Sequence, residues 1–454
     1  MRSPHALNLR ALLATGPQAA GALLGQLGTS QPTLSRAVAA LGDEVLRLGA
    51  ARSIHYALRD SARGLPAMPV HRVDAQGRLH RLGELVPVRP DGFVMLEASG
   101  RSLHSEGLPW WLADMRPEGF LGRAYAAHHG AALGLPPRPT EWTDTHVLRA
   151  LLGHGHDLPG HLLLGEAART HFLSAPPPQA IAEADQAAAY PRLAQAAAQG
   201  DRPGSSAGGE QPKFTAYVQT AQGPRHVLVK FSEAENSPVS ERWRDLLRVE
   251  HLALQTLLDA GVPAAHSQLL DAAGQRFLTV TRFDRTAEPA TGRHALVSLR
   301  TLDAEFVGAG TGGWPSIAAR LATARVITPQ AAAGAGLLWA FGSLVGNSDM
   351  HAGNLSFTGD SGRPYALAPA YDMTAMAFAP RSGGGLPDTL AEVDLRSDVP
   401  AATWRQALAL AQQLLQRLQA PAPAAQAFSP RFAPCLAALQ AHVTTAAQRI
   451  ARLA

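Results

Sequence analysis

Asp349, Asn354 and Asp372 are the residues whose types and spacing are best suited to chemistry. A carboxylate in the position of Asp349 can accept the proton of an attacking hydroxyl group and orient it. The carboxamide of Asn354 and the carboxylate of Asp372 offer hard oxygen ligands, which Mg²⁺ prefers. A predicted hairpin, residues 355–368, separates the last two and would bring them together. An aspartate, an asparagine five residues later, a hairpin and a second aspartate form the layout of a kinase catalytic centre.

Lysine is rare in this chain, which makes its two lysines informative. Of 40 Lys and Arg residues, only Lys213 and Lys230 are lysine. A guanidinium group does not replace a compact ammonium group well where a phosphate oxygen or a carboxylate must be met at close range. Lys230 ends a predicted strand, and Glu250 lies on the helix that follows, so we expect Glu250 to pair with Lys230 and orient it. Each of these residues alone has an ordinary structural explanation, but their order and spacing favour a kinase.

The segments that must position these residues predict an α+β protein with a bilobal, protein-kinase-like fold and a mostly helical C-lobe. We expect the limits of four domains at residues 1–63, 64–173, 174–314 and 315–454. Within the last two domains, the pattern of apolar residues predicts a hairpin, a helix, two strands and then mostly helices. The expected ranges are 214–219 and 226–231 for the hairpin, 241–260 for the helix, 267–270 and 277–282 for the strands, and 315–347 and 401–453 for the helical segments.

Residues 64–173 predict a small β-rich subdomain followed by helices. Strand-like segments alternate with turns over residues 67–98, residues 142–173 are expected to be helical, and residues 174–205 are expected to contain a short helix with loop-like flanks. This region is rich in histidine, but its spacing matches no known metal-binding motif. We therefore expect surface or core histidines rather than a metal site at His146, His154, His156, His161 and His171.

Residues 1–63 predict a basic module of three helices and a hairpin. Seven arginines stand against three acidic residues, and this excess of four equals the net charge of +4 of the whole chain. Helices over 7–13, 20–27 and 31–41 and strands over 45–48 and 54–58 are typical of a winged helix-turn-helix, whose helix 31–41 would enter the major groove of DNA. A three-helix protein-interaction module is the alternative. The residues expected to contact DNA are Gln31, Thr33, Ser35, Arg36 and Arg52.

Composition excludes several other classes of protein. The chain of 454 residues is 46% hydrophobic and 17% charged, which allows a sizeable core and rules out wholesale disorder. Its single cysteine, Cys435, excludes a disulfide scaffold and favours a reducing compartment. The apolar stretch 331–346 is short and rich in Ala and Gly, so we expect a buried helix rather than a membrane span. We expect a cytoplasmic protein with no membrane partner.

Taken together, these motifs resemble the HipA-type serine/threonine kinases, the toxins of bacterial toxin–antitoxin systems. The resemblance covers residues 67–454, and the preceding winged helix-turn-helix makes the chain similar to the YjjJ-like branch of that family. Two departures stand out: no GxGxxG motif is present, and Tyr371-Asp372-Met373 replaces the kinase DFG motif. The matching segments are residues 206–213 (SAGGEQPK), Val229-Lys230, Glu250, residues 282–285 (RFDR), residues 347–354 (NSDMHAGN) and Tyr371-Asp372.

The resemblance implies a role for each matching residue. Asp349 would be the catalytic base, Lys230 would bind the phosphates of ATP, and Asn354 and Asp372 would bind Mg²⁺. Ser206, or its neighbour Ser205, would be autophosphorylated, and phosphorylation of this loop would prevent ATP binding. His351, close to the base, is read as a structural residue of the catalytic loop and is grouped with the nucleotide-binding candidates. The remaining candidates for nucleotide binding are Gly208, Gly209, Gln211, Lys213 and Glu250.

The resemblance also implies partners, which the residues themselves do not name. A translation factor such as an aminoacyl-tRNA synthetase would be the protein substrate, with DNA and a separate antitoxin as further partners, unless the winged helix itself replaces the antitoxin. Two other functions remain open: a small-molecule phosphotransferase, and a DNA-binding regulator whose kinase-like domain senses nucleotide. The Ser206–Lys213 loop and the RFDR segment favour the protein kinase, and a base at Asp349 argues against a sensor.

Overall fold

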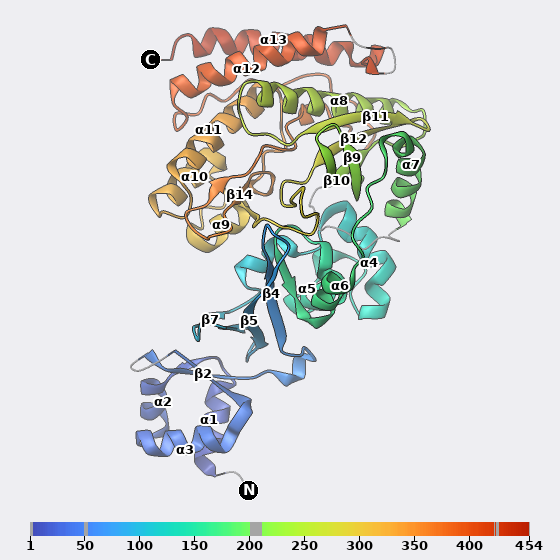
Figure 1. Ribbon diagram of the computed structural model, residues 1–454. Coiled ribbons are helices and arrows are strands. Elements are labelled where there is room, and N and C mark those ends of the chain that lie inside the picture. The colour runs from blue at the N-terminus through green and yellow to red at the C-terminus, as the bar shows by residue number, and fades with distance from the viewer. Residues whose placement is uncertain (1–2, 50–52, 200–210, 422, 424–425, 454) are drawn as a thin grey trace.

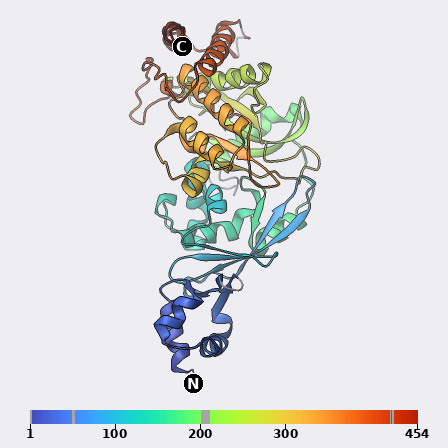
Figure 2. The same cartoon turned by 90° about the vertical axis from the view of Figure 1, so that its left-hand side faces the viewer.

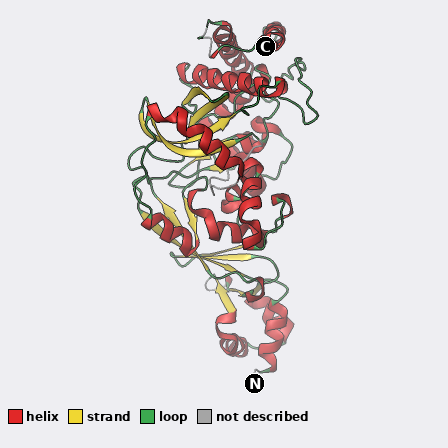
Figure 3. Ribbon diagram, turned by 90° about the vertical axis from the view of Figure 1, so that its right-hand side faces the viewer, coloured by secondary structure: helices red, strands yellow, loops and turns green. Residues whose placement is uncertain are grey.

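The computed structural model describes residues 3–49, 53–199, 211–421, 423 and 426–453. Figure 1 shows these residues arranged along one long axis, with the N-terminal helices at one end and helices α12 and α13 at the other. The view turned by 90° shows the same succession of parts (Figure 2). Figure 3 shows both helices and strands, with helices and no strands at the end that holds the C-terminus, in agreement with the α+β prediction.

The N-terminal part consists of three helices and a small antiparallel sheet. The predicted helices and the hairpin are confirmed, and a third, two-residue strand pairs with the hairpin in the order β1-β3-β2. Leu9, Leu13, Leu23 and Leu34 are buried between the helices because apolar residues recur on one face of each. The elements are α1 (Pro4–Leu13), β1 (Gln18–Ala19), α2 (Ala20–Leu27), α3 (Gln31–Leu41), β2 (Val45–Leu48) and β3 (His55–Leu58).

The middle part is built on a five-stranded antiparallel sheet of order β7-β6-β5-β4-β8. The expectation that residues 142–173 are helical throughout is wrong, because β8 interrupts them and pairs with β4. Leu163 and Leu164 are buried, and Gly165 turns the chain into the next helix with a φ of 83°. The elements are β4 (Met68–Val73), β5 (Leu79–Pro87), β6 (Phe93–Glu97), β7 (Ser102–Ser105), α4 (Gly119–Leu133), α5 (Asp144–His154), β8 (Leu162–Leu164) and α6 (Gly165–Ser174).

A four-stranded antiparallel sheet of order β11-β12-β10-β9 follows, with one helix before it and one within it. The predicted hairpin and strands are confirmed. The helix expected to be short within 174–205 instead spans 17 residues, and its Tyr190 and Ala194 are buried against the sheet. The elements are α7 (Glu183–Gln199), β9 (Lys213–Thr220), β10 (Gly223–Phe231), α8 (Pro238–Asp259), β11 (Ser267–Ala272) and β12 (Gln275–Thr281).

The remainder is mostly helical, as predicted, but each long helical segment is divided. Residues 315–347 contain two helices, because Arg325 adopts a φ of 57° and the Thr328 side chain caps the second helix. α11 is the buried helix expected over 331–346, and no helix of the described residues is both long and apolar enough to cross a bilayer. The elements are β13 (Val297–Ser298), α9 (Leu299–Phe306), α10 (Gly313–Thr323), α11 (Pro329–Leu344), β14 (Ser356–Thr358), β15 (Ala366–Leu367), α12 (Ala401–Gln419) and α13 (Ala433–Ile450).

Candidate active site

One cavity of about 700 Å³ collects most of the residues singled out in the sequence. It lies between the β9–β12 sheet and the loops that follow α11 and β15. The predicted site residues that line it are up to 159 positions apart in the chain. The predicted site residues in its lining are Lys213, Lys230, Glu250, Asp349, His351, Asn354 and Asp372.

Lys230 lies at the centre of a buried ionic cluster. Its Nζ atom donates to both carboxylate oxygens of Glu250, at 2.7 and 2.9 Å, and it also contacts the carboxylate of Asp372. The side chains of Lys230 and Glu250 are only 4% and 2% exposed, so the pairing predicted from the sequence is present and shielded from water. A buried ammonium group requires such balancing charge, and here the balance also fixes its direction toward the cavity.

The two lysines of the chain face each other across neighbouring strands. Lys213 of β9 is the register partner of Lys230 of β10, and both side chains are buried. Directly opposed residues of an antiparallel pair project from the same face of the sheet, so both belong to the wall of one cavity. The cavity wall therefore carries both lysines of the chain, with the ammonium group of Lys230 paired to Glu250 and Asp372.

The segment after α11 places Asp349 and Asn354 at the opposite wall. Asn354 donates from Nδ2 to the backbone carbonyl of Asp349 at 2.8 Å, which closes the loop. The Asp349 side chain is 49% exposed and open to solvent. His351 accepts from the backbone N–H of Gly353 at 3.0 Å, and its own carbonyl accepts from the indole N–H of Trp314. These bonds agree with a structural role for His351, whose ring nevertheless borders the cavity.

Asn347 is a site residue that the sequence prediction did not include. It is buried, and its side chain joins the two loops: Nδ2 donates to the carbonyl of Asp372 at 3.1 Å, and Oδ1 accepts from the backbone N–H of Asp349 at 3.0 Å. Asp372 itself has a φ of 53°, a left-handed conformation that costs energy for a residue with a side chain. The signal was available, because Asn347 is one of only four asparagines.

Comparison with known proteins identifies the family. A family model described as "YjjJ-like toxin, middle domain" matches residues 65–173, and one described as "HipA-like C-terminal domain" matches residues 205–432. "Toxin YjjJ" of Escherichia coli (strain K12) is 42% identical over 407 residues, which cover 89% of this chain and 91% of that protein. The chain belongs to the HipA family and to its YjjJ-like toxins. The resemblance stated from the sequence is therefore confirmed.

Solved structures show a more distant likeness to this YjjJ-like chain. HipA of Shewanella oneidensis MR-1, solved with HipB and operator DNA, gives a TM-score of 0.46 at 15% identity over 85% of this chain and 98% of its own. The Helicobacter pylori proinflammatory kinase CtkA gives a TM-score of 0.37 at 13% identity over 54% of this chain and 93% of its own. The family assignment accordingly rests on the sequence matches.

Several predicted residues of this YjjJ-like chain lie elsewhere. Ser206, Gly208, Gly209 and Arg52 are outside the described residues. Gln211 is half-buried and is not among the residues that line the cavity. In the N-terminal part, three predicted DNA contacts are exposed on α3. A fourth, Thr33, is half-buried, and its hydroxyl oxygen accepts from Nη2 of Arg36 at 3.2 Å. The exposed residues are Gln31, Ser35 and Arg36.

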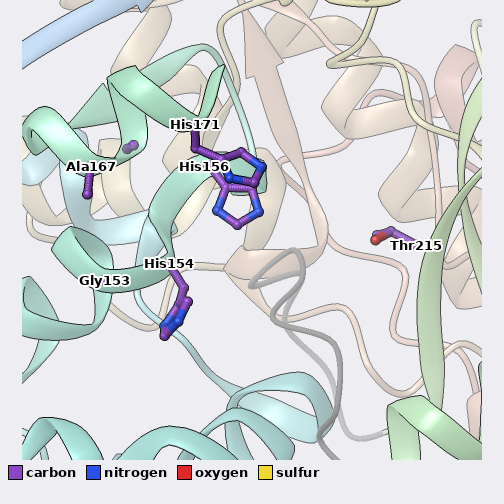
Figure 4. A pocket seen from close by; sticks show the side chains of 7 residues that line it. Gly153, His154, His156, Ala167, His171 and Thr215 are labelled. Atoms are coloured by element: carbon purple, nitrogen blue, oxygen red, sulfur yellow. The ribbon is translucent and has the colours of Figure 1, made fainter. Parts of the chain in front are cut away.

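Three histidines of the middle part lie beside a pocket of their own. Figure 4 shows His154, His156 and His171 beside a separate pocket, with the rings of His156 and His171 stacked at 3.8 Å between centroids. Burial and the nearby His171 lower the pKa of His156 to about 4, so it is uncharged at neutral pH. Among the described residues, no group of three or more His, Cys, Asp or Glu side chains is arranged to hold a metal ion.

Proposed function

We propose that this chain is an ATP- and Mg²⁺-dependent serine/threonine protein kinase that acts as the toxin of a type II toxin–antitoxin system. The observation that carries the proposal is the convergence of Lys230, Glu250, Asp349, Asn354 and Asp372 on one cavity. Its family supports the same conclusion, because the chain belongs to the YjjJ-like toxins. A translation factor such as an aminoacyl-tRNA synthetase is the proposed protein substrate, and the cytoplasm is the proposed location.

Each residue of the cavity has a task in this reaction. Lys230, oriented by Glu250, and Lys213 on the neighbouring strand neutralise phosphate charge, and Asp349 accepts the proton of an entering serine or threonine hydroxyl. The half-exposed side chain of Asp349 is accessible to such a hydroxyl from solvent. Asn354 and Asp372 supply oxygen atoms suited to Mg²⁺ at the same cavity. When bound, Mg²⁺ would neutralise the charge that develops on the phosphates.

The direct test is incubation of the full chain with γ-labelled ATP and Mg²⁺, followed by mapping of the phosphorylated residues. We expect label on Ser206, and we expect Ser206→Ala to remove most of it without lowering transfer to a protein substrate. Because phosphorylation adds about two negative charges to a loop proposed to cradle phosphates, the labelled protein should bind ATP more weakly. Labelling of a small alcohol but of no protein would instead support a small-molecule phosphotransferase.

Asn347→Ala tests how far the loop of Asp349 and the loop of Asp372 depend on the Asn347 side chain that joins them. Its loss removes the two hydrogen bonds that join the carbonyl of Asp372 to the N–H of Asp349, at about 0.5–1.5 kcal/mol for each bond. Because small displacements of reacting groups are costly, we expect phosphoryl transfer to fall about 10–100-fold. Asn236→Ala, at an exposed asparagine, is the control and should retain full activity. Equal activity of both variants would contradict the role of Asn347.

For the N-terminal part we propose a winged helix-turn-helix with α3 as the recognition helix. The exposed side chains of Gln31, Ser35 and Arg36 and the local excess of arginine support this proposal. The proposed domains keep the limits 1–63, 64–173, 174–314 and 315–454. DNA is the proposed partner of the first domain. A separate antitoxin is a further proposed partner, as the complex of the Shewanella HipA with HipB and DNA suggests.

Arg36→Ala should weaken DNA binding and lower the salt dependence of the affinity. Each phosphate contact that is lost reduces the slope of log K against log salt by about one unit. The measurement is a fluorescence anisotropy titration with duplex DNA at several salt concentrations. Arg101→Ala, which removes an exposed arginine of the middle part, serves as the control and should leave the slope unchanged. Identical slopes for both variants would favour the protein-interaction module.

A further inference from the structure

The middle part of the chain contributes directly to the wall of the proposed nucleotide cavity. The 3₁₀ helix η4 (Trp110–Met115) and the segments that follow α5 and η4 reach the cavity. They lie far in sequence from the catalytic loop, and they fall within the residues matched as the middle domain of YjjJ-like toxins. The lining residues from this part are Asp114, Arg116, Glu118, Gly119 and Pro159.

Asp157 lies between α5 and β8 of the middle domain. It binds the segment 282–285, which directly follows β12, the last strand of the β9–β12 sheet along the chain. Its carboxylate accepts from Nη1 of Arg282 at 2.9 and 3.1 Å and from Nη2 of Arg285 at 2.9 Å. The same two arginines hold Asp284, at 2.7 to 3.0 Å, and the carboxylate of Asp284 also accepts from the backbone N–H of Gly160. The two parts of the chain are therefore joined by a closed network of ion pairs.

Burial makes this network strongly interdependent. Arg282, Asp284 and Arg285 are all less than 9% exposed. Burial alone would raise the pKa of the Asp157 carboxyl group, but the guanidinium groups of Arg282 and Arg285 hold it well below its usual range. Without the charge of Asp157, the two buried arginines would share Asp284 as the remaining carboxylate of the network, so the segment would have to shift to recover partners or water.

The segment held in this way forms one wall of the cavity. Thr281, Arg282, Phe283 and Asp284 all line it, beside the apolar side chains of Leu228 and Val280. The ring of Phe283 also lies 5.7 Å from that of Tyr371, the residue before Asp372. The position of Phe283 is thus coupled to both the middle domain and the second loop of the site.

Asp114 makes a similar connection at another wall of the cavity. It accepts from the backbone N–H of Ser298 at 2.7 Å and from the hydroxyl groups of Ser298 and Thr301 at 2.6 and 2.9 Å. Ser298 caps α9 and is the register partner of Ser356, two residues after Asn354. The carboxylate of Asp114 therefore fixes the strand that lies against the catalytic loop.

We propose that Asp157 and Asp114 are positioning residues through which the middle domain sets the two walls of the active site. Asp157 holds the nucleotide-binding segment 281–285 through Arg282 and Arg285, and Asp114 holds the catalytic loop through Ser298 and β14. The middle domain is thus a working part of the kinase rather than an appended module. This inference rests on the proposed function, and it assigns the two carboxylates to separate steps, nucleotide binding and phosphoryl transfer.

The test measures both steps on the full chain with Asp157→Asn and Asp114→Asn. Binding is followed by titration with a fluorescent ATP analogue and Mg²⁺, and transfer by labelling at saturating ATP. For Asp157→Asn we expect the dissociation constant to rise about tenfold or more, with the saturated rate changed less than about threefold. For Asp114→Asn, which replaces a charged acceptor of three hydrogen bonds by a neutral amide with a single acceptor oxygen, we expect the saturated rate to fall about tenfold with unchanged nucleotide affinity.

Asp144→Asn is the matched control, because the Asp144 carboxylate accepts from the backbone N–H of Leu108 within the same domain at 2.7 Å. It is expected to lower the melting temperature while leaving affinity and rate unchanged. Asp157→Glu, which keeps the charge, should lie between the wild type and Asp157→Asn. If Asp157→Asn is unfolded at the assay temperature, Asp157→Glu decides, and wild-type affinity in that variant would overturn the proposal.

The outcomes separate this inference from the proposed function. A wild-type chain that binds nucleotide and transfers phosphate, with the separate defects given above, supports both. If the wild-type chain is active but all three aspartate variants lose affinity and rate to the same extent, the positioning roles alone are overturned, because general destabilisation would then explain the losses. A wild-type chain that neither binds nucleotide nor transfers phosphate overturns the proposed function, and the inference falls with it.

Discussion

Asp349→Asn is expected to lower phosphoryl transfer by about three orders of magnitude, which is within the range attributed to general bases. The amide has nearly the shape of the carboxylate, so the loop closed by Asn354 should persist, but it cannot accept the proton of the substrate hydroxyl. Nucleotide affinity should stay within about twofold, because the lysines proposed to bind phosphate lie on other elements of the cavity lining, β9 and β10. The measurement is the rate of label transfer at saturating ATP and Mg²⁺, with binding measured in parallel.

Asp360→Asn provides the control for this experiment. Asp360 lies in the turn between β14 and β15, which follows the loop of Asp349, and its side chain is similarly exposed. It accepts from His294 at 2.8 Å and from the backbone N–H of Ala295 at 2.7 Å, and it does not line the cavity. Its variant should keep the wild-type rate. A transfer rate in Asp349→Asn that matches that of Asp360→Asn would remove Asp349 from the role of base.

Lys230→Met is expected to have the second largest effect, on both activity and stability. It leaves the carboxylates of Glu250 and Asp372 facing each other without the ammonium group that balances them. Breaking a buried pair in this way costs about 3–5 kcal/mol in the free energy of unfolding. Loss of the ammonium group proposed to neutralise phosphate charge should also lower transfer about 100- to 1,000-fold. Denaturant unfolding and label transfer measure the two effects separately.

A second substitution distinguishes charge imbalance from loss of function. Lys230→Met combined with Glu250→Gln removes the uncompensated carboxylate, so stability should partly return while transfer stays at the level of Lys230→Met. Arg225→Met, at the far end of the same strand and outside the cavity lining, should leave both quantities unchanged. Recovery of activity in the double variant would show that Lys230 acts only through the stability of the fold.

The sequence predicted those parts of the site that lie on single elements. Lys230 at the end of a strand, Glu250 on the next helix and the Asn347–Asn354 loop could all be placed, because hydrophobic periodicity and turn residues act over short distances. The same reasoning failed where partners come from elsewhere in the chain. β8 became a strand because its leucines pair with β4, some 90 residues earlier, and no local pattern shows that pairing.

The connections between domains were equally hidden from the sequence. Asp157 and Asp114 are ordinary acidic residues in turn-like segments, and only the structure brings them to Arg282 and Ser298, more than 120 residues away. The RFDR segment was recognised as a motif, but the sequence did not show that both of its arginines pair with Asp157 of the middle domain. Family resemblance therefore located the proposed reacting groups, while the contacts that hold them became visible only in the structure.

The most direct test of the central claim is a titration of the full chain with a non-hydrolysable fluorescent ATP analogue, with and without Mg²⁺. If Lys230, Asn354 and Asp372 act on one nucleotide–magnesium complex, Mg²⁺ should strengthen binding to the wild-type chain, and Asp372→Asn should abolish that Mg²⁺ effect. Absence of binding, or the same Mg²⁺ dependence in Asp372→Asn as in the wild type, would contradict the assignment of this cavity as the active site of a kinase.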